Sequence, residues 1–332
     1  MAEIGVQAAS DEGGAKPLGP IVGPQGWKRR LEDPFNTYYR YPVALWIVRL
    51  LVHTPITPNQ VSLVQPILAA TSGWLISSGD PTRMMLAVAA FEIRSILDCV
   101  DGSLARAKRM SSPNGHAIDA MADWLGVVFL YIGLTMHFRT FPPSSAYGFL
   151  GGGAASIWTT VLVLAVSGFQ AGMRSFAFDY FKNKYLSIYE RGVDETIEGL
   201  RTKVLAQRAN PTFFGAIDVF IGRMGHLAFE REWFNPDTSR AQLSRSEIDA
   251  MAREQDSPRA RFIGVLWSLS GGDAYLSFVM VSLVVGRFLG VSEVWDAQVF
   301  FATFGLMWIV AVIAYNRHFI RTSRRAYQAV AA

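Results

Sequence analysis

Four aspartates lie where the sequence is otherwise apolar and where charge is expensive. Asp98 and Asp101 come near the end of one long apolar run, and Asp119 and Asp123 come near the start of the next. Residues three or four positions apart share one face of a helix, so each pair points in one direction. A short turn joins the two runs, which makes the two helices antiparallel neighbours. The spacing therefore predicts four carboxylates directed into one pocket, and ionisable groups inside membrane spans are functional candidates by default.

Carboxylates that share a pocket need countercharge to remain ionised at neutral pH. One divalent cation offsets two carboxylates, and two cations offset all four. Ligation by oxygen alone suits hard ions such as Mg²⁺ or Mn²⁺ and disfavours zinc, which prefers thiolates. The acidic cluster therefore predicts a magnesium or manganese site.

Small residues and one arginine accompany the aspartates. Gly102 and Ala105 follow Asp101 on the same helix, and Gly115 lies four positions before Asp119. Small side chains let a bulky ligand or a neighbouring backbone come close. Arg106 presents a planar fork of donors that suits phosphate oxygens. Each feature alone is commonly a cap, a packing residue or an interface anchor, but their combination in register favours a ligand site.

These residues form one continuous pattern, Asp98-x-x-Asp101-Gly102-x-x-Ala105-Arg106-x8-Gly115-x3-Asp119-x3-Asp123. The pattern resembles the signature of the CDP-alcohol phosphatidyltransferase family, and every fixed position is filled. A weaker resemblance extends to Thr57–Ser62, whereas residues 178–262 fall outside it as a sizeable insertion.

The resemblance implies a six-helix membrane enzyme with a wide cavity that faces the cytosol. Such an enzyme moves a substituted phosphate from a CDP-linked donor to an alcohol hydroxyl and releases CMP. By position, the four aspartates would hold two divalent metal ions, and Asp123 would also be the general base. The nucleotide site would be lined by Gly102, Ala105, Arg106 and Gly115. Members often pair, so the resemblance also implies a possible homodimer.

The composition agrees with a polytopic membrane protein of all-α class. Of 332 residues, 51% are hydrophobic and 17% are charged, against about 25% charged in a typical soluble domain. Six stretches are long and apolar enough to span a bilayer: residues 61–78, 84–105, 115–136, 146–176, 262–289 and 297–315. The hydrophobicity excludes a disordered chain, and the single Cys99 excludes a disulfide scaffold. A net charge of +4, without a basic run interleaved with aromatics, gives no reason to expect nucleic acid as a partner.

The sequence divides into six predicted segments. They are a disordered tail (1–32), a juxtamembrane amphipathic helix and linker (33–57), spans one to four with the signature (58–177), a cytosolic insertion (178–262), spans five and six (263–325), and a C-terminal tail (326–332). The amphipathic helix is expected at Pro42–His53, where aromatic residues and arginines suit the headgroup layer. Helix-like patterns at Glu190–Gln207 and Phe213–Phe229 stand out in the insertion; the second either lies on the membrane surface or covers a face of the bundle.

The orientation follows from the positions of lysine and arginine. The three predicted outside loops hold one arginine each, Arg83, Arg139 and Arg287, whereas the short inside segments are rich in cations. Positively charged short loops stay in the cytosol. We therefore expect both termini in the cytosol and an active site that opens to it.

Two further ionisable residues are candidates for contacts with substrate. Arg174, near the end of the fourth span, is expected either to reach a phosphate or to pair with Glu92 as a structural link. Asp273 follows Ser270-Gly271-Gly272 and is a candidate for the acceptor pocket.

Three functions remain open. The first is phosphatidyl transfer from CDP-diacylglycerol to a small polar alcohol, which is the leading hypothesis. The second exchanges the lipid and the polar alcohol between donor and acceptor, so that CDP-choline or CDP-ethanolamine donates to diacylglycerol or ceramide. The signature does not distinguish the first function from the second. The third is a divalent-cation channel or transporter, since acids inside the membrane also line ion paths. A transporter gives Gly102, Ala105 and Arg106 no role, and a catalytically dead scaffold conflicts with the intact signature.

Overall fold

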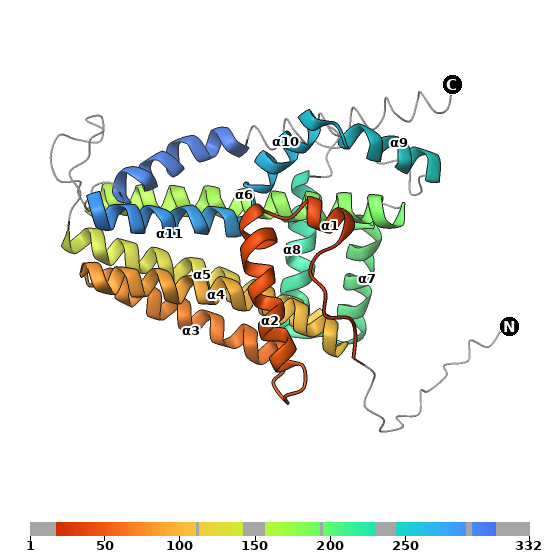
Figure 1. The fold of residues 1–332 in the computed structure, drawn as a ribbon, viewed down its shortest axis with the longest axis horizontal. Helices are drawn as coiled ribbons and strands as arrows, with labels where there is room; N and C mark the ends of the chain where they lie inside the picture. The colour runs from red at the N-terminus through yellow and green to blue at the C-terminus, as the bar shows by residue number, and fades with distance from the viewer. Residues whose placement is uncertain are drawn as a thin grey trace.

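The computed structural model describes residues 18–110, 113–141, 157–192, 195–229, 244–289 and 294–309. Within these ranges all regular secondary structure is helical, in agreement with the predicted all-α class. Helices α3 (Pro58–Ser77), α4 (Pro81–Lys108), α5 (Pro113–Thr140), α6 (Ile157–Arg191) and α11 (Gly272–Leu289) form one elongated bundle (Figure 1). A further helix, Val294–Ile309, packs against it through Trp295 and Val299.

Local sequence explains where the first two bundle helices begin. The Thr57 hydroxyl accepts a hydrogen bond from the backbone N–H of Gln60, and the Gln60 side chain accepts one from the backbone N–H of Thr57. This reciprocal pair is a capping box, and it starts α3. Asp80 caps α4 through the backbone N–H of Arg83. Pro58 and Pro81 occupy first-turn positions that tolerate proline.

Helices α3 and α5 touch backbone to backbone through a pair of glycines. A Cβ atom added to Gly133 would lie 2.5 Å from the Cα of Gly73, and one added to Gly73 would lie 3.1 Å from the carbonyl carbon of Phe129. Small residues permit this close approach of two helices in a membrane bundle. The contact fixes α5 against α3 at the end of the bundle away from the aspartates.

Three described helices are long and apolar enough to cross a membrane: Ile118–Thr140, Ile157–Arg191 and Gly272–Leu289. They correspond to the predicted third, fourth and fifth spans. The predicted first and second spans form helices α3 and α4, but polar and charged residues keep both outside this set. The predicted sixth span is represented by Val294–Ile309, and residues 310–315 lie outside the described residues, as do residues 146–156 of the fourth.

The predicted fifth span, residues 262–289, is not one continuous helix. Helix α10 (Pro258–Ser268) ends at Ser268, and α11 begins at Gly272. Leu269, Ser270 and Gly271 separate the two helices, since glycine favours helix ends over helix interiors. The membrane-length element is therefore α11 alone.

Helix α6 continues without a break past residue 178, where the insertion is predicted to begin. Its 35 residues extend about 52 Å, well beyond a hydrocarbon core of about 30 Å. The helix-like pattern predicted at Glu190–Gln207 is broken at Gly192, whose φ of 73° favours glycine. Helix α7 (Thr196–Ala209) follows the break, and α8 runs over Phe213–Phe229 as the sequence predicts. Helix α9 (Arg245–Gln255) precedes α10.

The N-terminal segment is ordered from residue 18 onward, although residues 1–32 are predicted to be a disordered tail; residues 1–17 lie outside the described residues. Helix α1 (Gly26–Arg30) places Trp27 against Tyr189, with ring centroids 3.9 Å apart. The backbone N–H of Gly19 donates to the carbonyl of Ala107, 2.7 Å away. Stacking and backbone pairing thus hold a segment whose composition alone suggests disorder.

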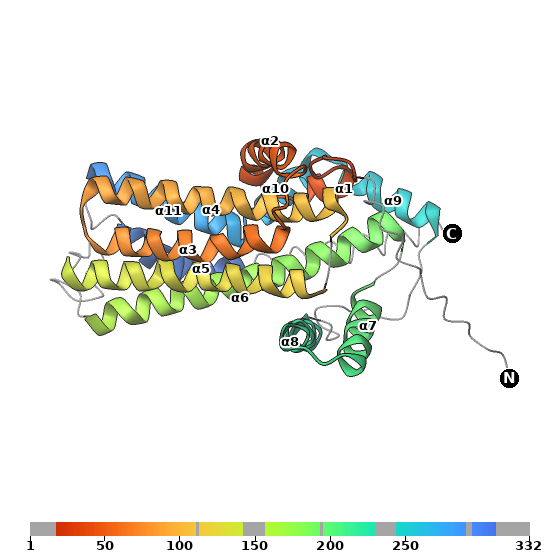
Figure 2. The same ribbon diagram turned by 90° about the horizontal axis from the view of Figure 1, so that it is seen from below.

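Two helices cross the bundle on opposite sides. The π-helical turn η1 (Asn36–Arg40) leads into α2 (Tyr41–Leu51), which lies across α4, and α8 crosses below α5 and α6 (Figures 1 and 2). Both run roughly perpendicular to the bundle axis near the same end of the molecule. A helix therefore exists where the amphipathic helix is predicted; its place in the headgroup layer stays a prediction.

Candidate metal and nucleotide site

Three of the four aspartates converge. One carboxylate oxygen from each of Asp98, Asp101 and Asp119 lies within 4.8 Å of the others. The first two come from the second half of α4, and the third comes from the first turns of α5. The antiparallel α4–α5 hairpin brings them together, and three carboxylates at this spacing suit a hard divalent cation.

Asp101 is held in place from α3. Its Oδ2 accepts hydrogen bonds from Ser62 Oγ at 2.6 Å and from Gln65 Nε2 at 2.7 Å. All three side chains are buried. Because both bonds go to Oδ2, the carboxylate orientation is fixed while Oδ1 remains for another partner. Hydrogen bonds of this kind orient metal-binding carboxylates.

Asp119 carries an unsatisfied atom. Its Oδ1 is buried and makes no hydrogen bond within the described part of the chain. A buried carboxylate oxygen without a partner is costly, and a cation at the three-carboxylate cluster removes that cost. The residues present therefore fit a divalent metal ion.

The fourth aspartate stands apart from this trio. Asp123 forms an ion pair with Arg94, whose Nη2 donates to Asp123 Oδ1. Arg94 is buried, whereas the Asp123 carboxylate is half exposed. The guanidinium lies against Gly126, where an added Cβ would be 3.2 Å from Arg94 Nε. The structure thus brings three predicted metal ligands together and places the predicted base, Asp123, beside them in an ion pair with Arg94.

The predicted nucleotide residues line the same end of α4 and α5. A Cβ on Gly102 would meet only Arg106 Nη1, at 3.7 Å, so this face of α4 stays open. Arg106 is exposed and donates from Nη2 to Ser103 Oγ at 3.0 Å. Ala105 and Gly115 are half-buried.

A third cation approaches from the N-terminal segment. Burial lowers the pKa of Lys28 on α1, and the neighbouring charges of Arg106 and Lys182 lower it further. Lys28, Arg106 and Lys182 thus lie near one another at this end of α4, and such a group of cations suits a ligand that carries phosphate. Sequence patterns did not indicate Lys28, because α1 reaches α4 only through the fold.

Asp273 belongs to a buried polar network. Its Oδ2 accepts a hydrogen bond from Asn36 Nδ2 at 2.7 Å, and its charge interacts with those of Asp98 and Asp123. Arg40 joins the network through a two-pronged ion pair with Glu92, at 2.7 and 2.9 Å, and through Ser277 Oγ at 2.8 Å. Asp273 therefore lies beside the acidic cluster, already engaged by the N-terminal segment.

Asp33 lies next to this network. Burial, and then the charges of Asp273 and Glu32, raise its pKa to about 7, against the opposing effects of the Asn36 backbone N–H and Arg40. The group thus keeps its proton at mildly acidic pH, where an exposed aspartate is ionised.

Arg174 lies away from the acidic cluster. Its guanidinium lies over the Tyr275 ring, 5.0 Å from the centroid, and its Nε is buried without a hydrogen bond in the described structure. Tyr275 belongs to a hydroxyl cluster with Tyr131 and Ser167. Glu92, the alternative partner, binds Arg40 instead.

Comparison with known proteins identifies the segment that contains this site. Residues 55–192 match the model of the CDP-alcohol phosphatidyltransferase family. They include α3, α4, α5 and α6, and with them all four aspartates. Residues 55–192 form a CDP-alcohol phosphatidyltransferase domain.

Two curated relatives resemble the domain region. A bifunctional IPC transferase and DIPP synthase of Rubrobacter xylanophilus is 34% identical over 112 residues, which cover 33% of this chain and 25% of the relative. A ceramide phosphoethanolamine synthase of Drosophila melanogaster is 29% identical over 133 residues, which cover 37% of this chain and 34% of the relative. The matches thus span about a quarter to a third of each relative. Both names denote synthases, and the second denotes one with a lipid product.

Proposed function

We propose that the CDP-alcohol phosphatidyltransferase domain transfers a substituted phosphate from a CDP-linked donor to an alcohol hydroxyl and releases CMP. The observation that carries this proposal is the convergence of Asp98, Asp101 and Asp119 within 4.8 Å inside the matched segment. A simple structural role does not explain three buried or half-buried acids that face one another.

Asp98, Asp101 and Asp119 would hold Mg²⁺ or Mn²⁺, with Asp123 contributing to a second ion. Held by these residues, two divalent cations would neutralise charge on the attacking and leaving oxygens of an in-line displacement. Ser62 and Gln65 keep the Asp101 carboxylate oriented for this role. Gly102 and Ala105 leave space for the nucleotide, Gly115 lies beside it, and Arg106 supplies donors to phosphate oxygens.

Asp123 is the proposed base. The alcohol oxygen forms the new bond to phosphorus, the bond from phosphorus to the CMP oxygen breaks, and the hydroxyl proton passes to the Asp123 carboxylate. A positioned base contributes about 10²–10⁴ in rate. Arg94 holds this carboxylate on one side, so Asp123 acts mainly through its position. Asp273 is proposed to contact the acceptor, whereas the position of Arg174 over Tyr275 favours a packing role.

The donor is proposed to be CDP-diacylglycerol, and the acceptor a small polar alcohol. The channel hypothesis gives no account of the open face at Gly102 or of the cations Lys28 and Arg106. We also propose six spans, both termini and the site on the cytosolic side, and no part for nucleic acid. A homodimer remains part of the proposal.

The test measures CMP release by the purified full-length protein with Mg²⁺ or Mn²⁺. One series contains CDP-diacylglycerol with a panel of polar alcohols, and the other contains CDP-ethanolamine or CDP-choline with diacylglycerol or ceramide. We expect metal-dependent CMP release and a lipid product, identified by mass, in the first series. Product in the second series alone would overturn the proposed donor, and no CMP with either would overturn the reaction class.

Reporter fusions test the orientation. A reporter after Ala332 and another near Asp237 are both expected in the cytosol. A signal from the opposite side at either position would contradict the proposed cytosolic site.

A further inference from the structure

Helix α8 carries a stripe of exposed apolar side chains along its whole length. Phe213, Phe220, Met224 and Leu227 recur at helical spacing on one face, and their exposed fractions are 70%, 63%, 45% and 60%. A contiguous exposed apolar surface of this kind marks an interaction site. The helix lies outside residues 55–192, so the family domain does not account for it.

The opposite side of α8 is firmly attached to the protein. Phe229 packs against Phe176 and Phe181, with ring centroids 5.6 and 5.4 Å apart. Asp218 is buried and accepts a hydrogen bond from Lys203 of α7 at 2.9 Å. The exposed stripe is therefore held in a fixed direction.

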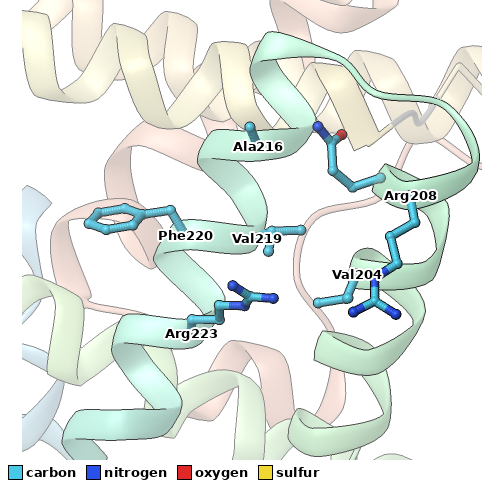
Figure 3. Close-up of a pocket in the computed structure, with 7 residues that line it drawn as sticks. Val204, Arg208, Ala216, Val219, Phe220 and Arg223 are labelled. Atoms are coloured by element: carbon cyan, nitrogen blue, oxygen red, sulfur yellow. The ribbon is translucent and has the colours of Figure 1, made fainter.

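That direction is toward the membrane-spanning part of the molecule. Phe220 points away from α7, whereas Arg223 points toward it (Figure 3). In both ribbon views α7 lies farther along the bundle axis than α8, toward the C-terminal end of α6 (Figures 1 and 2). The stripe thus faces the side on which a bilayer surrounds the bundle, and α8 crosses the bundle axis as a helix in the membrane plane does.

The charged residues of α8 agree with this orientation of the helix. Its single acid, Asp218, is buried and paired, so its exposed charge is cationic. A pocket of about 310 Å³ between α7 and α8 is lined by Arg208 and Arg223, together with Gln207, Val204 and Phe220. Neither arginine makes an ion pair with any other described residue.

We propose that α8 is an interfacial helix that binds anionic lipid. Its stripe lies among the upper acyl chains, and Arg208 and Arg223 bind the lipid phosphate at the pocket. Arginine is suited to phosphate through its planar fork of donors, and cations near an anionic leaflet attract such lipids. Together with α2 on the opposite side, α8 would support the catalytic end of the bundle at the membrane surface.

Nitroxide labelling of a Phe220→Cys variant tests the position of the stripe. The full-length protein is reconstituted in phosphatidylcholine bilayers that contain a quarter phosphatidylglycerol. Because Cys99 is the one native cysteine and is buried, labelling of the wild-type protein gives the background. We expect the label to be accessible to oxygen and shielded from a water-soluble nickel chelate.

An Arg201→Cys variant is the matched control, because Arg201 is 74% exposed on α7 and does not line the pocket. Its label is expected to show the reverse accessibility. Equal access of nickel to both labels would overturn the interfacial position. Spin–spin broadening at Phe220→Cys would overturn it in favour of contact with a second copy.

Lipid selectivity tests the arginines. A fluorophore at Phe220→Cys is quenched by brominated phosphatidylglycerol or brominated phosphatidylcholine, and the ratio gives the preference for the anionic lipid. We expect Arg208→Gln and Arg223→Gln each to reduce the preference about fivefold, which corresponds to about 1 kcal/mol per cation. Arg201→Gln should leave the preference for the anionic lipid unchanged, and Arg208→Lys and Arg223→Lys should largely retain it. An unchanged preference in the Arg208→Gln/Arg223→Gln double variant would overturn the proposed lipid site, whatever the catalytic activity.

Discussion

Replacing Gly133 by alanine tests the close contact between α3 and α5. The new Cβ would lie 2.5 Å from the Cα of Gly73 and 2.7 Å from its carbonyl carbon. Non-bonded carbons prefer about 3.5–4.0 Å, so the two backbones must separate by about 1 Å. The obstacle is backbone on both sides, and no flexible side chain can rotate away.

The expected cost is that of overpacking, about 1–3 kcal/mol. At about 2 °C per kcal/mol for a protein of this size, the unfolding midpoint should fall by about 2–6 °C. Gly133 lies about 21 Å along α5 from Asp119, so donor affinity should change much less than stability.

Thermal unfolding of purified protein in detergent measures this effect. Gly172→Ala is the matched control, because Gly172 lies within α6 and an added Cβ has nothing within 4 Å. Alanine without a clash in a helix interior is favourable by about 0.5–1 kcal/mol, so the two variants should shift the midpoint in opposite directions. If Gly133→Ala were as stable as Gly172→Ala, the backbone contact between α3 and α5 would be wrong.

Three further predictions concern the site and its supports. Asp98→Asn should weaken metal and CDP-ligand binding together with turnover, whereas Asp123→Asn should retain most binding and lose about 10²–10⁴ in turnover. Calorimetric binding of a CDP ligand, measured beside CMP release, separates the two outcomes. If Asp123→Asn kept more than about a tenth of the wild-type turnover, the assignment of Asp123 as the base would be wrong. Arg40→Gln should lower the free energy of unfolding by about 3–5 kcal/mol, because it leaves Glu92 without its buried partner. Arg49 is exposed on the following helix, so Arg49→Gln should leave the midpoint of thermal unfolding nearly unchanged. Asp33 keeps its proton in the fold to a pKa of about 7, so the unfolded state ionises first and wild-type stability should fall between about pH 4 and pH 7 by up to about 1.4 kcal/mol per unit. Asp33→Asn should reduce this slope in denaturant titrations, and an unchanged slope would contradict the raised pKa.

Helical spacing carries most of the information that the sequence holds about the site. The positions of Asp98, Asp101 and Asp119 on two antiparallel helices predict that their carboxylates meet. The separate position of Asp123 was not predictable, because it depends on the reach of Arg94 across α4 and α5 and on the space at Gly126. Gln65 could have been noticed as a polar residue in an apolar run, but its partner Asp101 is 36 positions away.

The limits of the fold prediction have equally local causes. The all-helical class follows from hydropathy and is confirmed. The separation of α10 from α11 was readable from Ser270-Gly271-Gly272, yet the apolar residues on both sides suggested one span. The order of residues 18–32 was not readable, since it depends on contacts such as Trp27 with Tyr189 that only the folded chain creates.

The network around Arg40 has a consequence for the order of assembly during synthesis. Arg40 finds Glu92 as soon as α4 is made, but its contact with Ser277 and that of Asn36 with Asp273 each wait for residues 237 positions later. Lys182, the partner of Glu32, comes 150 positions after it. The N-terminal segment therefore cannot complete its contacts with Asp273 and Ser277, beside the acidic cluster, until α11 has been made. A chain that stops before α11 would contain every residue of the signature and still lack the finished site.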